Sequence, residues 1–485
     1  MSWCLGGKKF INVNLNIMKI KILILICLII VSGKIASQSL QDVYKKPLKE
    51  VITEIETKYK IKLQYSESLV KGVDVFYSTW RYRSGIEETL TNILMPLDMI
   101  FEKTSDGVYK ITKYAYHVRP VDEGRKHLDR LLASYTTQSA WDLRKAELRK
   151  CFFEQLELSP LPKKTALNPI YTPKRQFDGY TVENVGLEVI PGVYVCGSIY
   201  RPSKGKGPFP AILCPHGHFS SPDLNQYGRY RPDQQYRCAM LARMGAVVFS
   251  YEMFAYGESL LQVKTEDHKT TLALTMQTLN SIRITDFLTS LPYVDPNRIG
   301  VTGESGGGTQ TFLLTALDDR VSVSVPVVMV SSYFFGGCAC ESGLPIHSCS
   351  DLGTNNAEIA AMASPRPMLV ISDGADWTQN VPVIEFPYLH KVYSLYGKQA
   401  DVENVHLATE GHDYGVSKRM AMYDFMAKHL GLNISAVKNK TGNIDESKVT
   451  IEKYEALLVF GKEGKLPATA VKGADEISRV LKSLQ

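Results

Sequence analysis

Short apolar runs alternate with longer amphipathic stretches between residues 176 and 432. The short runs predict buried strands, and the stretches whose apolar residues recur every three or four positions predict helices. This alternation is typical of an α/β fold with a mostly parallel, doubly wound sheet. We expect strands near residues 180–185, 193–200, 210–214, 246–251, 298–302, 322–330, 367–372 and 404–408. We expect helices near residues 235–244, 268–291, 307–317, 387–396 and 417–430.

A small α+β module is expected to precede this domain, over residues 38–115. Two stretches, 48–55 and 86–94, carry apolar residues at helical spacing. Four short strands are predicted around them, at residues 61–65, 73–75, 99–101 and 108–111. The last two flank a Ser-Asp-Gly sequence that is typical of a hairpin turn. The expected order is therefore α-β-β-α-β-β.

Two further segments complete the organisation of the chain. Residues 116–175 predict a bridge of two helices, near 121–135 and 141–158, followed by a proline-rich extended arm. The tail, residues 433–485, is polar and lysine-rich apart from one apolar patch and one amphipathic stretch. We expect this tail to pack on the large domain.

Residues 1–37 have the layout of a secretory signal peptide. Lys19 and Lys21 precede an apolar run at 22–31, and small or polar residues follow it. The run is too short for a comfortable membrane span, which needs about 20 residues. Cleavage within 36–39 is expected, with an uncleaved anchor as the alternative. The protein is therefore predicted to be exported, to the periplasm or beyond.

The charge of the chain gives no indication of a nucleic-acid partner. The formal net charge is +6, but residues 1–37 contribute five lysines and no acidic residue. Without that segment the charges nearly balance, so no basic field remains that would attract a phosphate backbone.

Seven cysteines lie beyond the signal segment, so at least one of them is free. Cys338, Cys340 and Cys349 cluster around a Gly-Gly pair, and one local disulfide is plausible there. A zinc site is a weaker alternative, because only His347 joins these cysteines and the spacing fits no zinc finger. We expect no resident metal and no cofactor.

Residues 303–307 read Gly-Glu-Ser-Gly-Gly, directly after an apolar strand and before a predicted helix. This context favours a nucleophile elbow, in which a tight turn raises a serine hydroxyl above the sheet. Glycines suit that turn because the backbone is strained and its neighbours approach closely. Ser305 is therefore the candidate nucleophile, and the alternative is an ordinary helix-capping serine.

A serine nucleophile needs a general base and an acid that orients it. His412 lies between the last predicted strand and the last predicted helix, where the base belongs in the order Ser, acid, His. Asp376 and Asp373 both follow the strand near 367–372, and we prefer Asp376 because it lies deeper in the loop. Glu341 is a third choice for the acid.

The developing oxyanion needs two preorganised N–H donors. The backbone N–H of Gly306, directly after the nucleophile, should be one of them. The other should come from the loop His-Gly-His-Phe at 216–219, and we assign it to His218. Aromatic residues near the predicted strand ends are candidates for stacking against sugar rings, although core packing is the commoner reason for such residues. The three we select are Phe219, Tyr256 and Trp377.

The chain from about residue 141 to 432 resembles α/β-hydrolases of the bacterial acetylxylan-esterase-like group. The matching stretches are RIGVTGESGGGTQT at 298–311, GGCACE at 336–341, TNN at 354–356, DWT at 376–378 and GHDY at 411–414. The resemblance implies a serine esterase that removes acetyl groups from a polysaccharide such as xylan by way of an acyl-enzyme. Related hydrolases act on pectic or glucuronoyl esters of uronic acids. The glucuronoyl group usually has an arginine after the serine, and Gly306 departs from that pattern.

Residues 38–115 resemble the STN module of secretins and TonB-dependent receptors, which implies a contact with an envelope partner. A non-catalytic, receptor-associated protein is the alternative of another class, and the intact set of Ser305, Asp376 and His412 argues against it. A serine peptidase of this fold would favour a large N-terminal propeller, for which residues 38–115 are too few. Metal-dependent deacetylation would need a cluster of His and Asp ligands, and the sequence shows none.

Overall fold

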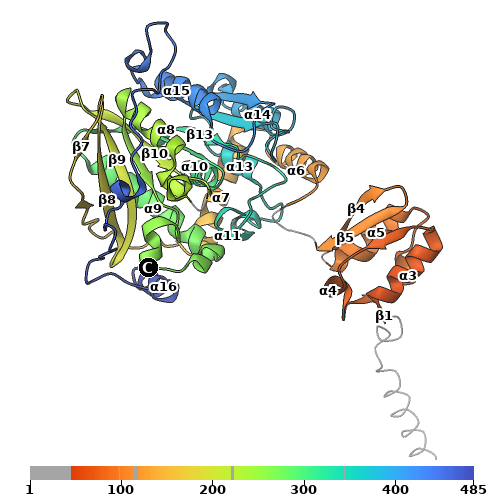
Figure 1. The fold of residues 1–485 in the computed structure, drawn as a ribbon. Helices are drawn as coiled ribbons and strands as arrows, with labels where there is room; N and C mark the ends of the chain where they lie inside the picture. The colour runs from red at the N-terminus through yellow and green to blue at the C-terminus, as the bar shows by residue number, and fades with distance from the viewer. Residues whose placement is uncertain (1–44, 98, 114–117, 220–222, 343) are drawn as a thin grey trace, which may run out of the picture. The chain divides into compact units, whose positions relative to one another are not determined.

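A computed structural model describes residues 45–97, 99–113, 118–219, 223–342 and 344–485, and the predicted signal segment lies outside them. The chain divides into two compact units, Met1–Ala115 and Tyr116–Gln485 (Figure 1). Within the described ranges, no helix is both long and apolar enough to cross a membrane. Export and the envelope contact stay predictions.

The N-terminal unit combines short strands with two amphipathic helices. The strands form two sheets, an antiparallel pair β1-β3 and a three-stranded sheet in the order β2-β5-β4. Its elements are β1 (Lys45–Pro47), α3 (Leu48–Tyr59), β2 (Lys62–Gln64), α4 (Glu67–Val70), β3 (Asp74–Phe76), α5 (Ile86–Leu94), β4 (Met99–Ser105) and β5 (Val108–Lys113). The apolar faces of α3 and α5 fill the core between them. The sequence pattern did not indicate β1 or α4, since both are very short.

The large unit is built on one sheet in the order β15-β14-β13-β12-β10-β11-β9-β8-β6, with β7 also paired to β8. Strands β10 to β15 are parallel to one another, whereas β9, β8, β7 and β6 add antiparallel strands at one edge. The strands are β6 (Ile170–Tyr171), β7 (Arg175–Gln176), β8 (Tyr180–Ile190), β9 (Val193–Pro202), β10 (Phe209–Pro215), β11 (Val247–Tyr251), β12 (Val294–Glu304), β13 (Val321–Val327), β14 (Met368–Asp373) and β15 (Val402–Leu407).

Helices cover both faces of this sheet, as Figure 1 shows. Alternate residues of β10 belong to different cores: Ala211 and Leu213 to one, Ile212 and Cys214 to the other. The first core contains residues of α9 (Thr271–Ser290), α10 (Gly306–Leu317), α13 (Asn356–Ala361) and α14 (Glu385–Ser394). The second contains residues of α8 (Pro232–Arg243) and α15 (Val416–Leu430). The expected doubly wound α/β-hydrolase architecture is confirmed.

The bridge and the tail both pack on the large unit. The bridge forms α6 (Val121–Ser134) and α7 (Gln138–Gln155), and Trp141 of α7 is fully buried. In the tail, α16 (Ala474–Ser483) contributes Ile477 and Leu481 to the first core. The Asn184 side chain also donates hydrogen bonds to the carbonyls of Ala456 and Leu458, both at 2.9 Å.

Two disulfides are present in the described residues. Cys338 and Cys340 are joined locally, whereas Cys349 pairs with Cys151 of α7, 198 residues away in sequence. The weaker alternative from the sequence, a zinc site that combines Cys349 and His347 with Cys338 and Cys340, is therefore wrong, because Cys349 is bonded to Cys151. The remaining thiols, at Cys196, Cys214 and Cys238, are buried.

Replacing both Cys151 and Cys349 by serine is expected to lower the free energy of unfolding of the large unit by up to about 5 kcal/mol. The reason is that this crosslink closes a very long loop and so restricts the unfolded chain. Denaturant unfolding without reductant, followed by tryptophan fluorescence, measures the difference. Equal midpoints for the variant and the oxidised parent protein would contradict this expectation.

Candidate active site

Ser305 lies at a sharp turn between β12 and α10. Its backbone has φ 54° and ψ −124°, which a residue with a side chain rarely adopts, and its N–H donates to the Val327 carbonyl at 3.1 Å. A Cβ at Gly303 would lie 2.6 Å from the Pro215 oxygen, and one at Gly307 would lie 2.7 Å from it. The turn therefore requires these glycines, and it places Ser305 at the carboxyl edge of the sheet.

The position after the nucleophile is crowded by two neighbouring side chains. A Cβ at Gly306 would lie 2.6 Å from Cε1 of His218 and would also collide with Met253. An arginine at this position, as in the usual glucuronoyl-esterase elbow, would require the Met253 side chain and the His218 ring to shift.

His412 and Asp376 form a hydrogen-bonded pair. His412 follows β15, Asp376 follows β14, and Nδ1 of the imidazole lies 2.6 Å from Oδ2 of the carboxylate. The other carboxylate oxygen accepts from the N–H and the hydroxyl of Thr378, at 2.5 and 2.6 Å. A carboxylate only accepts, so Nδ1 carries the proton and Nε2 presents a lone pair. This is the tautomer that a general base for serine requires.

His412 and Ser305 both lie close to Phe219. Phe219 contacts His412 with a ring-centroid distance of 6.1 Å. A Cβ at Gly217 would lie 2.8 Å from the Phe219 ring and 3.0 Å from Cβ of Ser305. Among the described residues, no hydrogen bond joins the Ser305 hydroxyl to His412. Such catalytic contacts often tighten only when substrate binds.

The two alternative acids are engaged elsewhere. The Asp373 side chain is fully buried, lies 3.4 Å from Nζ of Lys418 and accepts the N–H of Ala375. Burial, followed by the charge of Asp376, raises the pKa of Asp373. Glu341 contacts Nδ1 of His218 at 2.9 Å instead. Burial alone would raise the pKa of the Glu341 carboxyl, but His218 and the Gly337 N–H hold it below its ordinary value.

Both predicted oxyanion donors are placed near the nucleophile. The Gly306 N–H is the first of α10 and so has no partner within the helix. In the loop after β10, the Gly217 N–H donates to Glu304 and the Phe219 N–H donates to the Gly217 carbonyl. The His218 N–H contacts no acceptor in the described part of the chain, so it is available to a ligand.

A buried charge cluster lies beneath the elbow, and the sequence pattern did not predict it. Glu304, directly before the nucleophile, has a fully buried carboxylate that pairs with Arg237 at 2.7 Å and Arg231 at 3.0 Å. The Arg231 guanidinium in turn lies over the Phe219 ring, 3.5 Å from its centroid. The cluster therefore connects the elbow to the oxyanion loop. One feature of the sequence could have indicated this cluster: Glu304 is a charged residue within a motif that is otherwise buried.

The predicted sugar-stacking residues have separate surroundings. Trp377 stacks on Phe334 with a ring-centroid distance of 4.0 Å, and its ring centroid lies 4.5 Å from that of His412, so it is next to the candidate base. Phe219 lies against Arg231 and His412 and also contributes to packing. Tyr256 instead contacts the rings of His268 and His218, with centroid distances of 4.9 and 5.9 Å.

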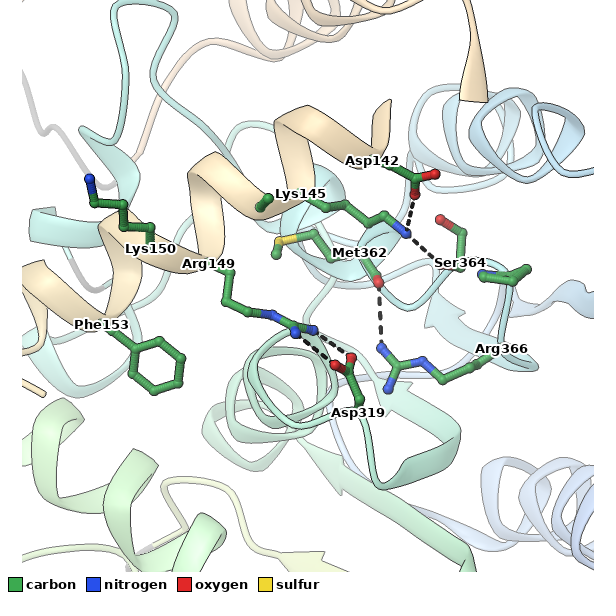
Figure 2. Close-up of a pocket in the computed structure, with 11 residues that line it drawn as sticks. Asp142, Lys145, Arg149, Lys150, Phe153, Asp319, Met362, Ser364 and Arg366 are labelled. Carbon is green, nitrogen blue, oxygen red and sulfur yellow. Dashed lines mark hydrogen bonds and ion pairs between the residues drawn. The ribbon is translucent and has the colours of Figure 1, made fainter. Parts of the chain in front are cut away.

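A groove of about 650 Å³ lies on the large unit, but it is separate from these residues (Figure 2). Four of its charged side chains form two ion pairs: Arg149 binds Asp319 at 2.6 Å, and Lys145 binds Asp142 at 3.0 Å. Asp319 precedes β13, so the groove adjoins the amino ends of the strands, whereas the catalytic candidates follow their carboxyl ends.

The fold defines the large unit as an α/β-hydrolase. Among solved structures, the chain is 43% identical to methylesterase BT1017; the match covers 93% of this chain and 98% of that one, with a TM-score of 0.78. The chain therefore belongs to the family of carbohydrate esterases that contains this methylesterase. Since 93% of the chain is covered, the match extends into the N-terminal unit.

A curated relative is the 4-O-methyl-glucuronoyl methylesterase of Neurospora crassa, 26% identical over 299 residues, which cover 54% of this chain and 70% of that protein. No protein-family model matches the chain. The expectation of a carbohydrate esterase with an α/β-hydrolase fold is confirmed, whereas the expected preference for acetylated xylan gains no support from these relatives.

Proposed function

We propose that this protein hydrolyses methyl esters of uronic acids in a polysaccharide, with methylated pectin as the substrate class. The observation that carries this proposal is the similarity to a methylesterase over nearly the full length of both chains, together with the His412–Asp376 pair and the sharp turn that carries Ser305. The crowding at Gly306 favours a pectic ester over a glucuronoyl ester, because the arginine usual in the latter group would displace the His218 ring.

In the proposed mechanism, the Ser305 hydroxyl attacks the ester carbonyl while Nε2 of His412 takes its proton. The tetrahedral oxyanion is stabilised by the N–H groups of Gly306 and His218, and by the amino-terminal end of α10. Methanol leaves with the proton from His412, and the uronic acid stays bound to Ser305 as an acyl-enzyme. Water then attacks by the same steps and releases the carboxylate.

A second candidate function is hydrolysis of a methyl 4-O-methylglucuronate ester. The observation that favours it is the similarity to the Neurospora crassa enzyme, whose name states that activity. The same residues would carry the same steps, so the two candidates differ only in the sugar that the cleft accepts.

The test compares four substrates: methylated pectin, a methyl 4-O-methylglucuronate, acetylated xylan and 4-nitrophenyl acetate. Each is assayed for released methanol, acetate or nitrophenol beside Ser305→Ala, whose rate gives the background. We expect methanol release from pectin at least about 100-fold above that background, since general base catalysis alone contributes about that much. Serine-dependent acetate release without methanol would move the substrate class to acetyl esters. If none of the four substrates is hydrolysed faster than the Ser305→Ala background, the proposal of an esterase for these classes of substrate is contradicted.

A further inference from the structure

Three loops at the carboxyl edge of the sheet converge on a cluster of side chains to which the esterase mechanism assigns no role. His218 follows β10, His268 lies in a 3-10 turn at Thr265–Lys269 after β11, and Cys338 and Cys340 follow β13. Their ring nitrogens and sulfur atoms all lie within 4.8 Å of one another. His268 and Cys340 are buried, and His218 and Cys338 are partly buried.

The hydrogen bonds of the two imidazoles fix where their lone pairs point. Nδ1 of His218 lies 2.9 Å from the Glu341 carboxylate, and Nδ1 of His268 lies 2.6 Å from the Phe254 carbonyl. Both partners only accept, so each Nδ1 is the N–H donor. In the neutral form of each ring the lone pair is therefore at Nε2, and these two nitrogens are 2.7 Å apart.

In the disulfide form, the sulfur atoms place no hydrogen between themselves and the two Nε2 atoms. Sγ of Cys340 lies 2.8 Å from Nε2 of His218 and 3.0 Å from Nε2 of His268, and Sγ of Cys338 lies 3.4 Å from the former. The two cysteines are joined in a disulfide, whose sulfur atoms carry no proton. Two imidazole nitrogens and two sulfur atoms thus converge on one point, where a single metal ion would contact all four.

We propose that His218, His268, Cys338 and Cys340 bind one Zn²⁺ ion when the cysteines are in the dithiol form. Two imidazoles and two thiolates are a ligand set that suits tetrahedral zinc. Each thiol releases its proton to solvent on binding, and the two thiolates balance the charge of the ion. The chain is synthesised with thiols, so zinc competes with disulfide formation at the same sulfur atoms and no reductant is needed.

The contacts beyond the four ligands are those that a metal site uses. A histidine ligand commonly donates its second ring N–H to a carboxylate or a backbone carbonyl, which orients the ring. His218 does so with Glu341, and His268 with Phe254. Four protein ligands leave no open position for a substrate, so the ion is structural. It ties the loop that carries the His218 N–H to the loops after β11 and β13.

The test uses the full chain without its signal segment, reduced by a phosphine in the absence of oxygen. The phosphine takes its oxygen atom from water and leaves two thiols at each reduced disulfide. After zinc is added and excess is dialysed away, elemental analysis is expected to give one zinc per chain. Co²⁺ in place of zinc is expected to give a thiolate-to-cobalt charge-transfer absorption, which reports ligation directly and needs no variant.

Two variants and a control locate the ion. His268→Gln and the double variant Cys338→Ser/Cys340→Ser are expected to lose at least about nine-tenths of the bound zinc, since each removes ligands from a four-ligand site. His390→Gln, at an exposed position of α14, is expected to keep it. The proposal is overturned if alkylation shows free thiols at 338 and 340 while the chain retains no zinc. It is equally overturned if the variants bind as much zinc as His390→Gln does.

Discussion

Asp376→Asn is expected to lower kcat for ester hydrolysis by about 10⁴-fold, whereas Asp373→Asn is expected to keep kcat within about 10-fold. An asparagine at 376 presents either an amide N–H or a neutral oxygen to Nδ1 of His412. The N–H forces the proton onto Nε2, and the neutral oxygen no longer stabilises the imidazolium that forms when Ser305 is deprotonated. The 2.6 Å contact between His412 and Asp376 is therefore the one that matters for the rate.

Asp373 provides the matched control, because it lies on the same strand end and is also buried. Its removal leaves the Lys418 ammonium with Asp413 at 2.8 Å and the Gly411 carbonyl at 2.7 Å, so that charge keeps its partners. The measurement is kcat on any ester that the parent protein turns over, with circular dichroism to verify folding. The assignment is wrong if Asp373→Asn lowers kcat by about 10⁴-fold while Asp376→Asn remains active.

The positions of Ser305, His412 and Asp376 could be predicted because each follows a strand that the apolar pattern already indicated. Parallel strands bring their carboxyl ends to one edge, so residues far apart in sequence meet there without any knowledge of side-chain packing. The choice between Asp376 and Asp373 was harder, since both follow the same strand. Only the contact of Asp376 with His412, and of Asp373 with Lys418, distinguishes them.

Contacts between loops were beyond the sequence pattern. His218 and His268 are 50 residues apart and neither belongs to a metal-ligand motif, so nothing in their spacing indicates that their rings meet. The proximity of Cys338 and Cys340 in sequence drew attention to these two cysteines, but it suggested His347, rather than His218 and His268, as the neighbouring histidine. His347 instead bonds the Asn356 side chain at 2.8 Å. Loop conformation depends on what each loop packs against, which periodicity does not report.

The same limit applies to pairing over long separations. The disulfide partner of Cys349 lies on α7. This helix packs on the large unit through the buried Trp141, and nothing in the sequence indicates which residues Trp141 packs against. The short strand β1 and helix α4 were missed for a different reason. Runs of three or four residues are too short to show a period of either 2 or 3.6.

Glu304→Gln is expected to lower the free energy of unfolding by about 3–5 kcal/mol, which is the usual effect of breaking a buried ion pair from one side. The carboxylate is fully buried against Arg237 and Arg231, and a neutral amide would leave both guanidinium groups without their shared partner. Asp233 contacts both arginines, at 2.5 and 3.9 Å, and offsets only part of this loss.

The matched control is Glu403→Gln, which removes an exposed carboxylate paired with Lys428 at 2.8 Å. Exposed pairs contribute about 0–1 kcal/mol, so this variant should unfold close to the parent protein. Denaturant unfolding followed by tryptophan fluorescence measures both variants, and coincident midpoints for the two would show that the cluster beneath the elbow is not stabilising.

Glu304 also accepts the Gly217 N–H, so in Glu304→Gln the loop that carries the His218 N–H loses an anchor. A fall in kcat larger than any rise in KM should accompany the loss of stability, because an oxyanion donor acts mainly in the transition state.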